Sequence, residues 1–219
     1  MNQNITPGTV TDYQEAWSET MTKQVLASKE EWRRARLELL AEEKAMTKAL
    51  EKLARKRREL PWVAVEKDYQ FTAPEGTESL ADLFAGRKQL LTISNTSKDK
   101  IEAYRKRMGW QFKWVSSLGS DFNHDMNVTF SAEDQASGEM EYNFARKTFP
   151  SSETPGLSAF IRTDEGGIAH TYPCYARGLE IFNSAYQMLD MTALGRHENP
   201  QPYPMSWVRR RDQYENKDQ

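Results

Sequence analysis

The sequence predicts an α/β fold preceded by one long, highly charged helix. Between residues 29 and 59 the chain holds 11 basic and 7 acidic side chains among 31 residues. From residue 62 onward, short alternating apolar segments are interleaved with short helical ones, an order typical of α/β proteins. The 219 residues are enough for one or two domains with a real hydrophobic core.

Composition argues against several classes of protein. A net charge of −2 disfavours a nucleic-acid binder that works by overall electrostatics. A single Cys excludes an internal disulfide, a thiolate zinc site and a redox pair of cysteines. No phosphate-binding or dinucleotide-binding glycine motif occurs, and no cofactor or metal is predicted. No apolar run is long enough to span a membrane and the first 11 residues lack a signal peptide's apolar core, so we expect a cytoplasmic protein.

Residues 28–60 are expected to form the long helix, since Ser28 and Glu31 stand at capping-box spacing and Pro61 stops it. Its apolar positions recur every seven residues, at Trp32, Leu39, Met46, Leu53 and Leu60. Such a stripe either packs on the protein's own domain or pairs with a second copy in a homodimer. Nucleic-acid binding by the basic residues 55–58 is disfavoured because interleaved Glu side chains cancel most of the field.

The body of the protein is expected at residues 61–198, between a mobile arm at 1–27 and a Pro-rich strap at 199–219. Strands are predicted at 63–65, 69–71, 89–94, 112–115, 157–162 and 168–172. Helices are predicted at 79–84, 96–108 and 176–189, with a polar loop at 116–125 and a hairpin turn at 164–167.

Several motifs resemble a family of thioredoxin-like proteins that is known as a domain of unknown function and as predicted dithiol-disulfide oxidoreductases. They occur in the family's order from about residue 27 to the C-terminus. They are Leu60-Pro61-Trp62-Val63, Glu66-Lys67-Asp68-Tyr69, Asp82-Leu83-Phe84, Lys100-Ile101-Glu102-Ala103-Tyr104, Arg107-Met108-Gly109-Trp110, Gly119-Ser120-Asp121-Phe122-Asn123, Pro155-Gly156-Leu157-Ser158 and His170-Thr171-Tyr172 with Tyr175-Ala176-Arg177-Gly178. The resemblance implies a thioredoxin-like sheet flanked by helices.

The same resemblance implies that a segment is missing. Family members carry a cysteine pair, its helix and a further strand after the strand equivalent to residues 88–91, and this chain has none of them. Cys174 lies where a small hydroxyl residue is expected, so it is not a displaced catalytic cysteine. The family's fold places a cis proline at Pro155, facing the usual active site. A shortened sheet would leave an exposed edge or an opened cavity, which a partner chain, the long helix or a ligand would cover.

The densest polar group in the body surrounds His124, with Asp121 and Asp125 close enough in sequence to orient its ring. Resembling proteins carry Tyr at this position. A surface loop, a general acid/base and a metal site stay open as interpretations, although no second His lies at ligand spacing.

His170 is expected on the same strand face as Ile168 and Tyr172, either as a hydrogen-bonded core residue or as a second polar group of the site, near Pro155. Residues that could bind a small substrate are Tyr172, Tyr175 and Arg177 as donors and Trp110, Trp114 and Phe122, with Phe112, as an apolar wall.

Three functions therefore remain. The first is a small-molecule enzyme or ligand-binding protein that has lost its redox dithiol and acts by acid/base chemistry of the isomerisation, dehydration or cyclisation type. The second is a non-catalytic dimeric binding module held by the long helix or an exposed sheet edge. The third is residual thiol chemistry at Cys174, which would need a thiol of lowered pKa.

Overall fold

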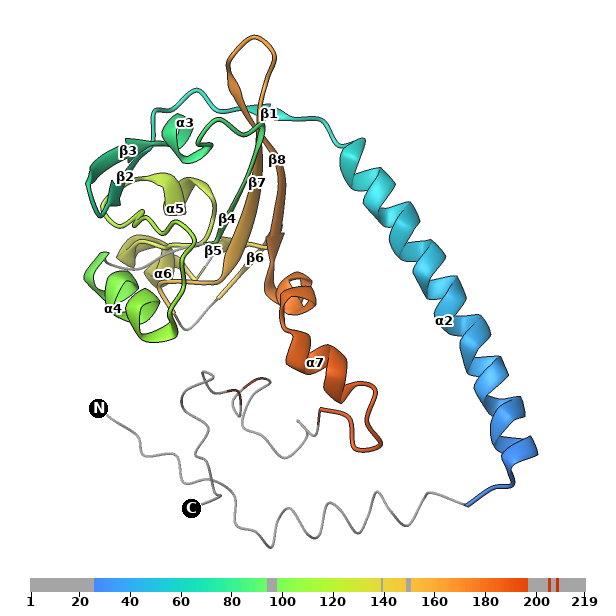
Figure 1. Cartoon of the computed structure of the whole chain (residues 1–219). Helices are drawn as coiled ribbons and strands as arrows, with labels where there is room; N and C mark the ends of the chain where they lie inside the picture. The colour runs from blue at the N-terminus through green and yellow to red at the C-terminus, as the bar shows by residue number, and fades with distance from the viewer. Residues whose placement is uncertain are drawn as a thin grey trace, which may run out of the picture. The chain divides into compact units, whose positions relative to one another are not determined.

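The computed structural model describes residues 26–93, 98–138, 140–148, 151–196, 205 and 208 (Figure 1). The chain divides into two compact units, Met1–Lys56 with Ser184–Val208, and Arg57–Asn183 with Arg209–Gln219. The predicted arm and strap lie outside the described residues, except for two residues of each. The first unit contains the long helix and the second contains a small antiparallel sheet, so the chain is mixed α/β.

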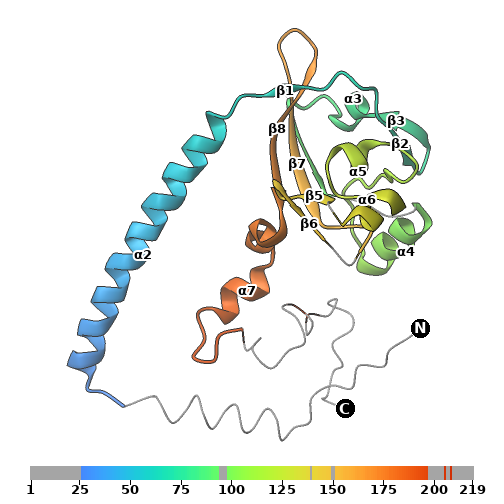
Figure 2. The same cartoon turned by 180° about the vertical axis from the view of Figure 1, so that it is seen from behind.

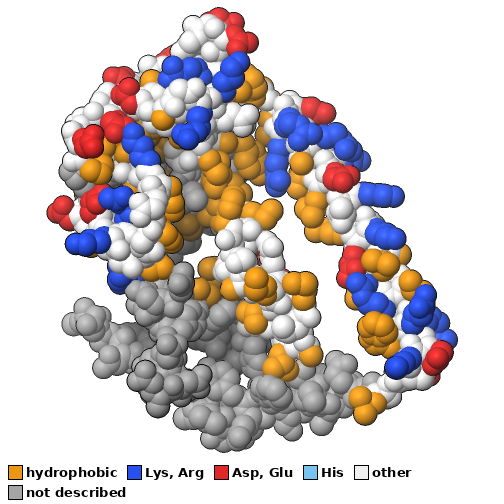
Figure 3. Space-filling model, viewed as in Figure 1, with side chains coloured by type: hydrophobic (Ala, Val, Ile, Leu, Met, Phe, Trp, Pro, Cys, Tyr) orange, Lys and Arg blue, Asp and Glu red, His pale blue; other side chains and the backbone are white. Residues whose placement is uncertain are grey.

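The predicted long helix is confirmed as α2 (Lys29–Arg58). Ser28 and Glu31 form the expected capping box, since the Ser28 hydroxyl accepts from the Glu31 amide at 3.2 Å and the Glu31 carboxylate accepts from the Ser28 amide at 2.9 Å. Within the described part of the chain, α2 buries none of its residues. Figure 3 shows hydrophobic and charged side chains interspersed along its surface.

The helix expected over residues 176–189 is broken in two. Ala176–Phe182 forms the 3₁₀ helix η1, and α7 (Ser184–Leu189) follows. Asn183 separates them with φ −100° and ψ 87°, outside the helical region. No helix in the described ranges is long and apolar enough to cross a membrane.

The second unit is built on a four-stranded sheet in the order β1-β8-β7-β4, with each neighbouring pair antiparallel (Figures 1 and 2). Its strands are β1 (Val63–Ala64), β4 (Gln89–Ile93), β7 (Gly156–Arg162) and β8 (Ile168–Tyr175). All four were expected as strands, and β7 and β8 form the predicted hairpin. This small antiparallel sheet does not by itself confirm a thioredoxin-like fold.

Shorter elements complete this unit. They are the hairpins β2 (Gln70–Ala73) with β3 (Gly76–Ser79) and β5 (Met140–Tyr142) with β6 (Ala145–Lys147), and the helices α3 (Leu80–Leu83), α4 (Lys98–Met108), α5 (Phe122–Asp125) and α6 (Ala132–Ser137). The strand predicted at 112–115 is not formed, and only Ser116 bridges Thr72 there. The loop predicted at 116–125 instead contains α5. The first two residues of the helix predicted at 96–108 lie outside the described residues.

Two apolar clusters form the core of the second unit. The first contains Tyr69, Phe71, Leu80, Phe84, Phe122 and Phe160. The second contains Val128, Phe130, Met140, Tyr142 and Tyr175. In both views α3, α5 and the β2–β3 hairpin lie on the same side of the sheet, where the first cluster joins them to β7 (Figures 1 and 2).

Two predictions are wrong, one about the faces of β8 and one about a proline peptide bond. His170 pairs with Phe160 and Tyr172 with Ala159, so an irregularity at Thr171 turns His170 and Tyr172 to opposite faces of β8. Strict alternation, on which the prediction was based, fails where an extra residue enters a strand. The Thr154–Pro155 peptide bond is trans rather than cis.

Candidate functional site

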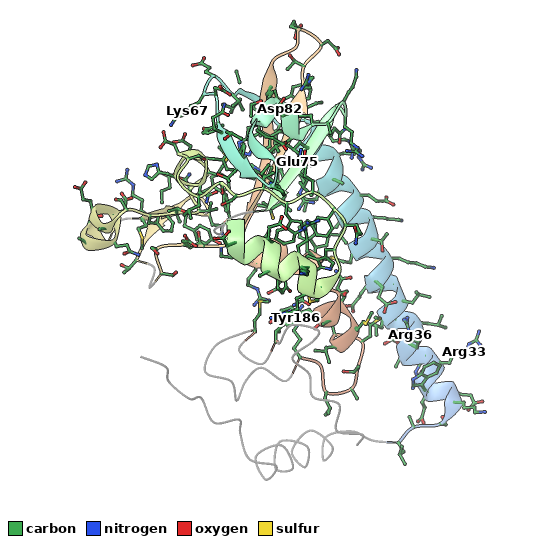
Figure 4. All side chains as sticks on the ribbon, turned by 60° about the vertical axis from the view of Figure 1, so that its left-hand side comes forward. Arg33, Arg36, Lys67, Glu75, Asp82 and Tyr186 are labelled. Carbon is green, nitrogen blue, oxygen red and sulfur yellow. The ribbon has the colours of Figure 1, made fainter. Side chains whose placement is uncertain are left out.

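A group of polar side chains joins two motifs that lie far apart in the sequence. We define the polar cluster as Lys67, Tyr69, Asp121, His124, Asp125 and Asp134. The Lys67 ammonium lies 2.6 Å from Asp121 Oδ2 and 2.9 Å from Asp125 Oδ2. The Tyr69 hydroxyl donates to Asp125 Oδ2 at 2.7 Å. Figure 4 labels Lys67, on the segment that enters β2.

The short helix α5 positions the acidic half of this cluster. Asp121 is its first flanking residue and makes no side-chain capping bond, so its carboxylate is available to Lys67. Phe122 anchors the helix because it is 4% exposed and its ring meets that of Tyr69 edge to face at 5.1 Å. Packing of these two aromatic rings therefore fixes the distance between the two polar halves.

His124 lies between two carboxylates. Its Nδ1 is 3.9 Å from Asp125 Oδ1 and its Nε2 is 3.8 Å from Asp134 Oδ2. Asp134 is itself fixed by the capping box of α6, in which its carboxylate accepts from the hydroxyl and the amide of Ser131 at 2.8 Å. The imidazole is 63% exposed, so solvent or a ligand can reach it.

Hydrogen bonding fixes the charges around this imidazole. Bonds to Asp121 and Asp125 hold the pKa of Lys67 above its usual range. Burial and the bond to Asp125 raise the pKa of Tyr69 to about 12. Burial alone would raise the pKa of Asp125, but bonds from Lys67 and Tyr69 outweigh it and lower that pKa. At neutral pH this gives an ammonium, a neutral phenol and a carboxylate in the polar cluster that contains His124.

A hydrophilic pocket of about 430 Å³ opens beside the polar cluster. Lys67, Tyr69 and Asp121 line one part of it. The rest is lined by Asp68, Gln70, Phe71, Thr72, Thr77, Leu118, Gly119 and Ser120. Hydroxyl, amide and charged groups dominate this lining, which suits a small polar molecule.

His170, the other predicted catalytic residue, is half-buried on β8. Its ring stacks on Phe160 at 4.9 Å, and its Nε2 is buried without a hydrogen-bond partner among the described residues. Burial lowers its pKa, against a smaller opposing effect of a backbone hydrogen bond at Tyr172. It belongs neither to the polar cluster nor to the lining of the adjacent pocket.

The predicted substrate-binding residues of β8 and η1 meet in a different place. Tyr172, Tyr175 and Arg177 line a groove of about 600 Å³, together with Cys174 and Phe144. Arg177 is paired with Glu180 at 3.1 Å. The Cys174 sulfur packs against Gly178, where an added Cβ would come within 2.7 Å of it.

The predicted aromatic wall is split between two sites. Trp110 and Trp114 stack on each other at 5.3 Å, and Phe112 lies beside them with 58% exposure. Phe122 belongs to the core instead. Pro155 lies next to the second apolar cluster, where its carbonyl accepts from the Tyr142 hydroxyl at 2.8 Å.

The structure thus brings His124, Asp121 and Asp125 together and adds three residues that the sequence did not predict for this site. Lys67 and Tyr69 belong to one of the family-like motifs, but nothing in the sequence connects that motif to α5. Asp134 stands three residues after Ser131, a capping-box spacing that is a usable signal for α6. Within the described ranges, no group of three His, Cys, Asp or Glu could hold a metal ion.

Comparison with known proteins identifies a family whose function is unknown. No curated protein and no solved structure matches the chain. Two stretches, residues 21–94 and 89–214, match the model of a bacterial protein family of unknown function (DUF899). Both stretches include residues 89–94, which contain β4. The sequence resemblance implies that a segment is missing after this strand. Since the match covers well over half of the chain, the protein belongs to this bacterial family of unknown function.

Proposed function

We propose that the protein binds a small polar molecule at the polar cluster and acts on it by acid/base chemistry. The observation that supports this most directly is the position of His124 between two fixed carboxylates. The reaction class would be an isomerisation, dehydration or cyclisation, in which a proton is removed next to a polarised carbonyl. The scaffold would be thioredoxin-like without a dithiol, as the order of its motifs suggests.

Lys67, His124 and the carboxylates of the polar cluster have separate roles in this chemistry. Lys67 gives two hydrogen bonds to Asp121 and Asp125, and its ammonium has a third N–H for a carbonyl or anionic oxygen of the ligand. His124 takes up or delivers the proton. The carboxylates of Asp125 and Asp134 lie beyond hydrogen-bond distance of the ring, so they stabilise the imidazolium without occupying its nitrogens.

Proton exchange on simple carbonyl compounds tests the proposal. The protein would be incubated in D₂O with acetone, pyruvate or dihydroxyacetone, and loss of the α-proton signal would be followed by ¹H NMR. We expect faster exchange than in buffer, and loss of that acceleration in His124→Gln. His197→Gln, which removes another imidazole outside the described residues, is the matched control. No acceleration by the wild type, or equal rates for the wild type and His124→Gln, would contradict the proposal.

A second candidate is a dimeric binding module held by α2, and the exposure of its stripe favours it. Trp32, Leu39 and Met46 are 64%, 51% and 59% exposed. Residues 29–43 carry four basic and five acidic side chains, whereas residues 44–58 carry seven basic and one acidic. An antiparallel pair places unlike halves side by side and avoids the repulsion of a parallel pair.

Light scattering on full-length variants tests this second candidate. Leu39→Asp lies on the stripe, and Leu37→Asp is a matched control because Leu37 is 53% exposed but off the stripe. If α2 pairs, only Leu39→Asp lowers the measured mass. A Leu39→Asp variant that keeps the dimeric mass of the wild type would exclude α2 as the interface.

A further inference from the structure

The two edges of the central sheet differ. On one side the last strand is β1, which has two residues and follows Pro61 closely. On the other side the last strand is β4, which has five residues and, in the described part of the chain, pairs with β7 alone. Short strands and nearby prolines protect an edge from further pairing, whereas a longer regular strand leaves it open.

Register shows which backbone groups face outward from β4. The Lys88 carbonyl accepts from the Arg162 amide at 2.9 Å, one step before Gln89 pairs with Ile161. In an antiparallel ladder, residues that bond to one neighbour alternate with residues that face the other side. Lys88, Leu90 and Thr92 therefore bond to β7. The amides and carbonyls of Gln89, Leu91 and Ile93 point to the open edge.

The sequence of β4 contains none of the usual protections of an edge strand. Gln-Leu-Leu-Thr-Ile has no charge, no Pro and no Gly, and Leu91 at its centre is 54% exposed. Natural edge strands usually carry a charged side chain, a Pro or a bulge that prevents pairing with another chain. An edge that lacks all three is suited to pairing with another strand.

We infer that β4 pairs antiparallel with β4 of a second copy of this chain. A two-fold axis at the centre of the strand sets Leu91 opposite Leu91 of the partner subunit. Gln89 then lies opposite Ile93 of the partner subunit, and the reverse pair forms by symmetry. All three outward-facing residues of each copy gain both backbone hydrogen bonds, and the two sheets become continuous. Because the strand is uncharged, this symmetric pairing places no like charges within β4 opposite each other.

Light scattering on the full-length protein tests the interface. We expect twice the mass of one 25.4 kDa chain for the wild type, and a single-chain mass for Leu91→Lys. Val63→Lys is the matched control, because Val63 is 66% exposed on the opposite edge strand and should leave the dimer intact. A monomeric wild type, or a Leu91→Lys variant that stays dimeric, would overturn the inference. Loss of the dimer in Leu39→Asp alone would assign it to α2 instead.

A cross-link tests the register and does not require a lysine on the strand. Directly opposed residues of a hydrogen-bonded pair have Cβ atoms about 5.5 Å apart, beyond the roughly 3.5–4.5 Å of a direct disulfide, so a short bis-maleimide is used to join them. In a Cys174→Ser background, Leu91→Cys should form a covalent dimer with this reagent, and Val63→Cys should not. Failure of Leu91→Cys to cross-link, or equal cross-linking of both variants, would overturn the proposed register.

Discussion

Replacing Tyr69 by Phe isolates one hydrogen bond of the polar cluster. The variant keeps the buried ring and its edge-to-face contact with Phe122, and it loses the hydroxyl that donates to Asp125 at 2.7 Å. A hydrogen bond to a charged group contributes about 1.5–3 kcal/mol. The Asp125 side chain is 30% exposed, so solvent screening favours the lower end, about 1.5 kcal/mol. For a chain of this size that corresponds to a fall in Tm of about 3–6 °C.

The pH dependence of this loss gives a second check. The pKa of Asp125 is lowered in the folded protein, so its stabilising effect is present above the unfolded pKa of about 3.9 and is lost as the pH falls through the folded value. The difference in stability between wild type and Tyr69→Phe should therefore be complete at neutral pH and shrink in acid.

Urea denaturation of both proteins at several pH values measures this difference. Tyr172→Phe serves as control, because its hydroxyl accepts an exposed hydrogen bond from Arg57 and its loss should cost at most a few tenths of a kcal/mol. Equal stability of wild type and Tyr69→Phe at pH 7 would show that the Tyr69–Asp125 hydrogen bond does not stabilise the fold. A difference that persists unchanged below the folded pKa of Asp125 would refute its electrostatic part.

Three further variants test other parts of the second unit. Gly156→Ala should lower the free energy of unfolding by about 1–3 kcal/mol, because the added Cβ would overlap a methyl group of Val128. In a double-mutant cycle, Val128→Ala should reduce that cost. Additive effects of the two substitutions would contradict the overlap. Phe144→Gly should stabilise the protein by about 1 kcal/mol, because Asn143 and Phe144 both have positive φ in a hairpin turn and the Phe144 side chain is 77% exposed. A thermal melt measures the change. A lower Tm for the variant would contradict this prediction, since the contacts of the ring would then stabilise more than the backbone strain destabilises. Burial lowers the pKa of His170, so the free energy of unfolding should fall as the pH drops below the unfolded pKa of about 6.5. His170→Phe should remove this part of the pH dependence of stability. The same pH dependence in the variant and the wild type would contradict the prediction.

Local sequence signals predicted the elements that depend on neighbouring residues. The capping box at Ser28 and the seven-residue stripe predicted α2, and the turn residues at 164–167 predicted the β7–β8 hairpin. The strand prediction at 112–115 is wrong because alternating aromatic residues, although typical of a strand, also occur where rings stack in a loop. In the structure Trp110, Phe112 and Trp114 pack on one another without forming a ladder.

The candidate site could be predicted only in part. Asp121, His124 and Asp125 are neighbours in sequence, so their association follows from local spacing. Lys67 lies more than fifty residues earlier, and the packing of Tyr69 and Phe71 on Phe122 brings it to the carboxylates. Strict alternation along a strand predicts that His170 and Tyr172 lie on one face. This prediction is wrong because the sequence carries no signal for the irregularity at Thr171.

The amino-acid sequence is sufficient to establish the charged helix, the α/β order, the lack of a cysteine pair and membership of a bacterial family of unknown function. The helix and the α/β order follow from periodicity and capping, which act over a few residues. Only the folded chain shows which motif meets which, that β4 is the last strand of the sheet among the described residues, and that His170 is half-buried against Phe160, apart from the polar cluster. Such properties depend on contacts between distant segments, and those form only when apolar side chains such as Phe122 and Phe160 pack into one core.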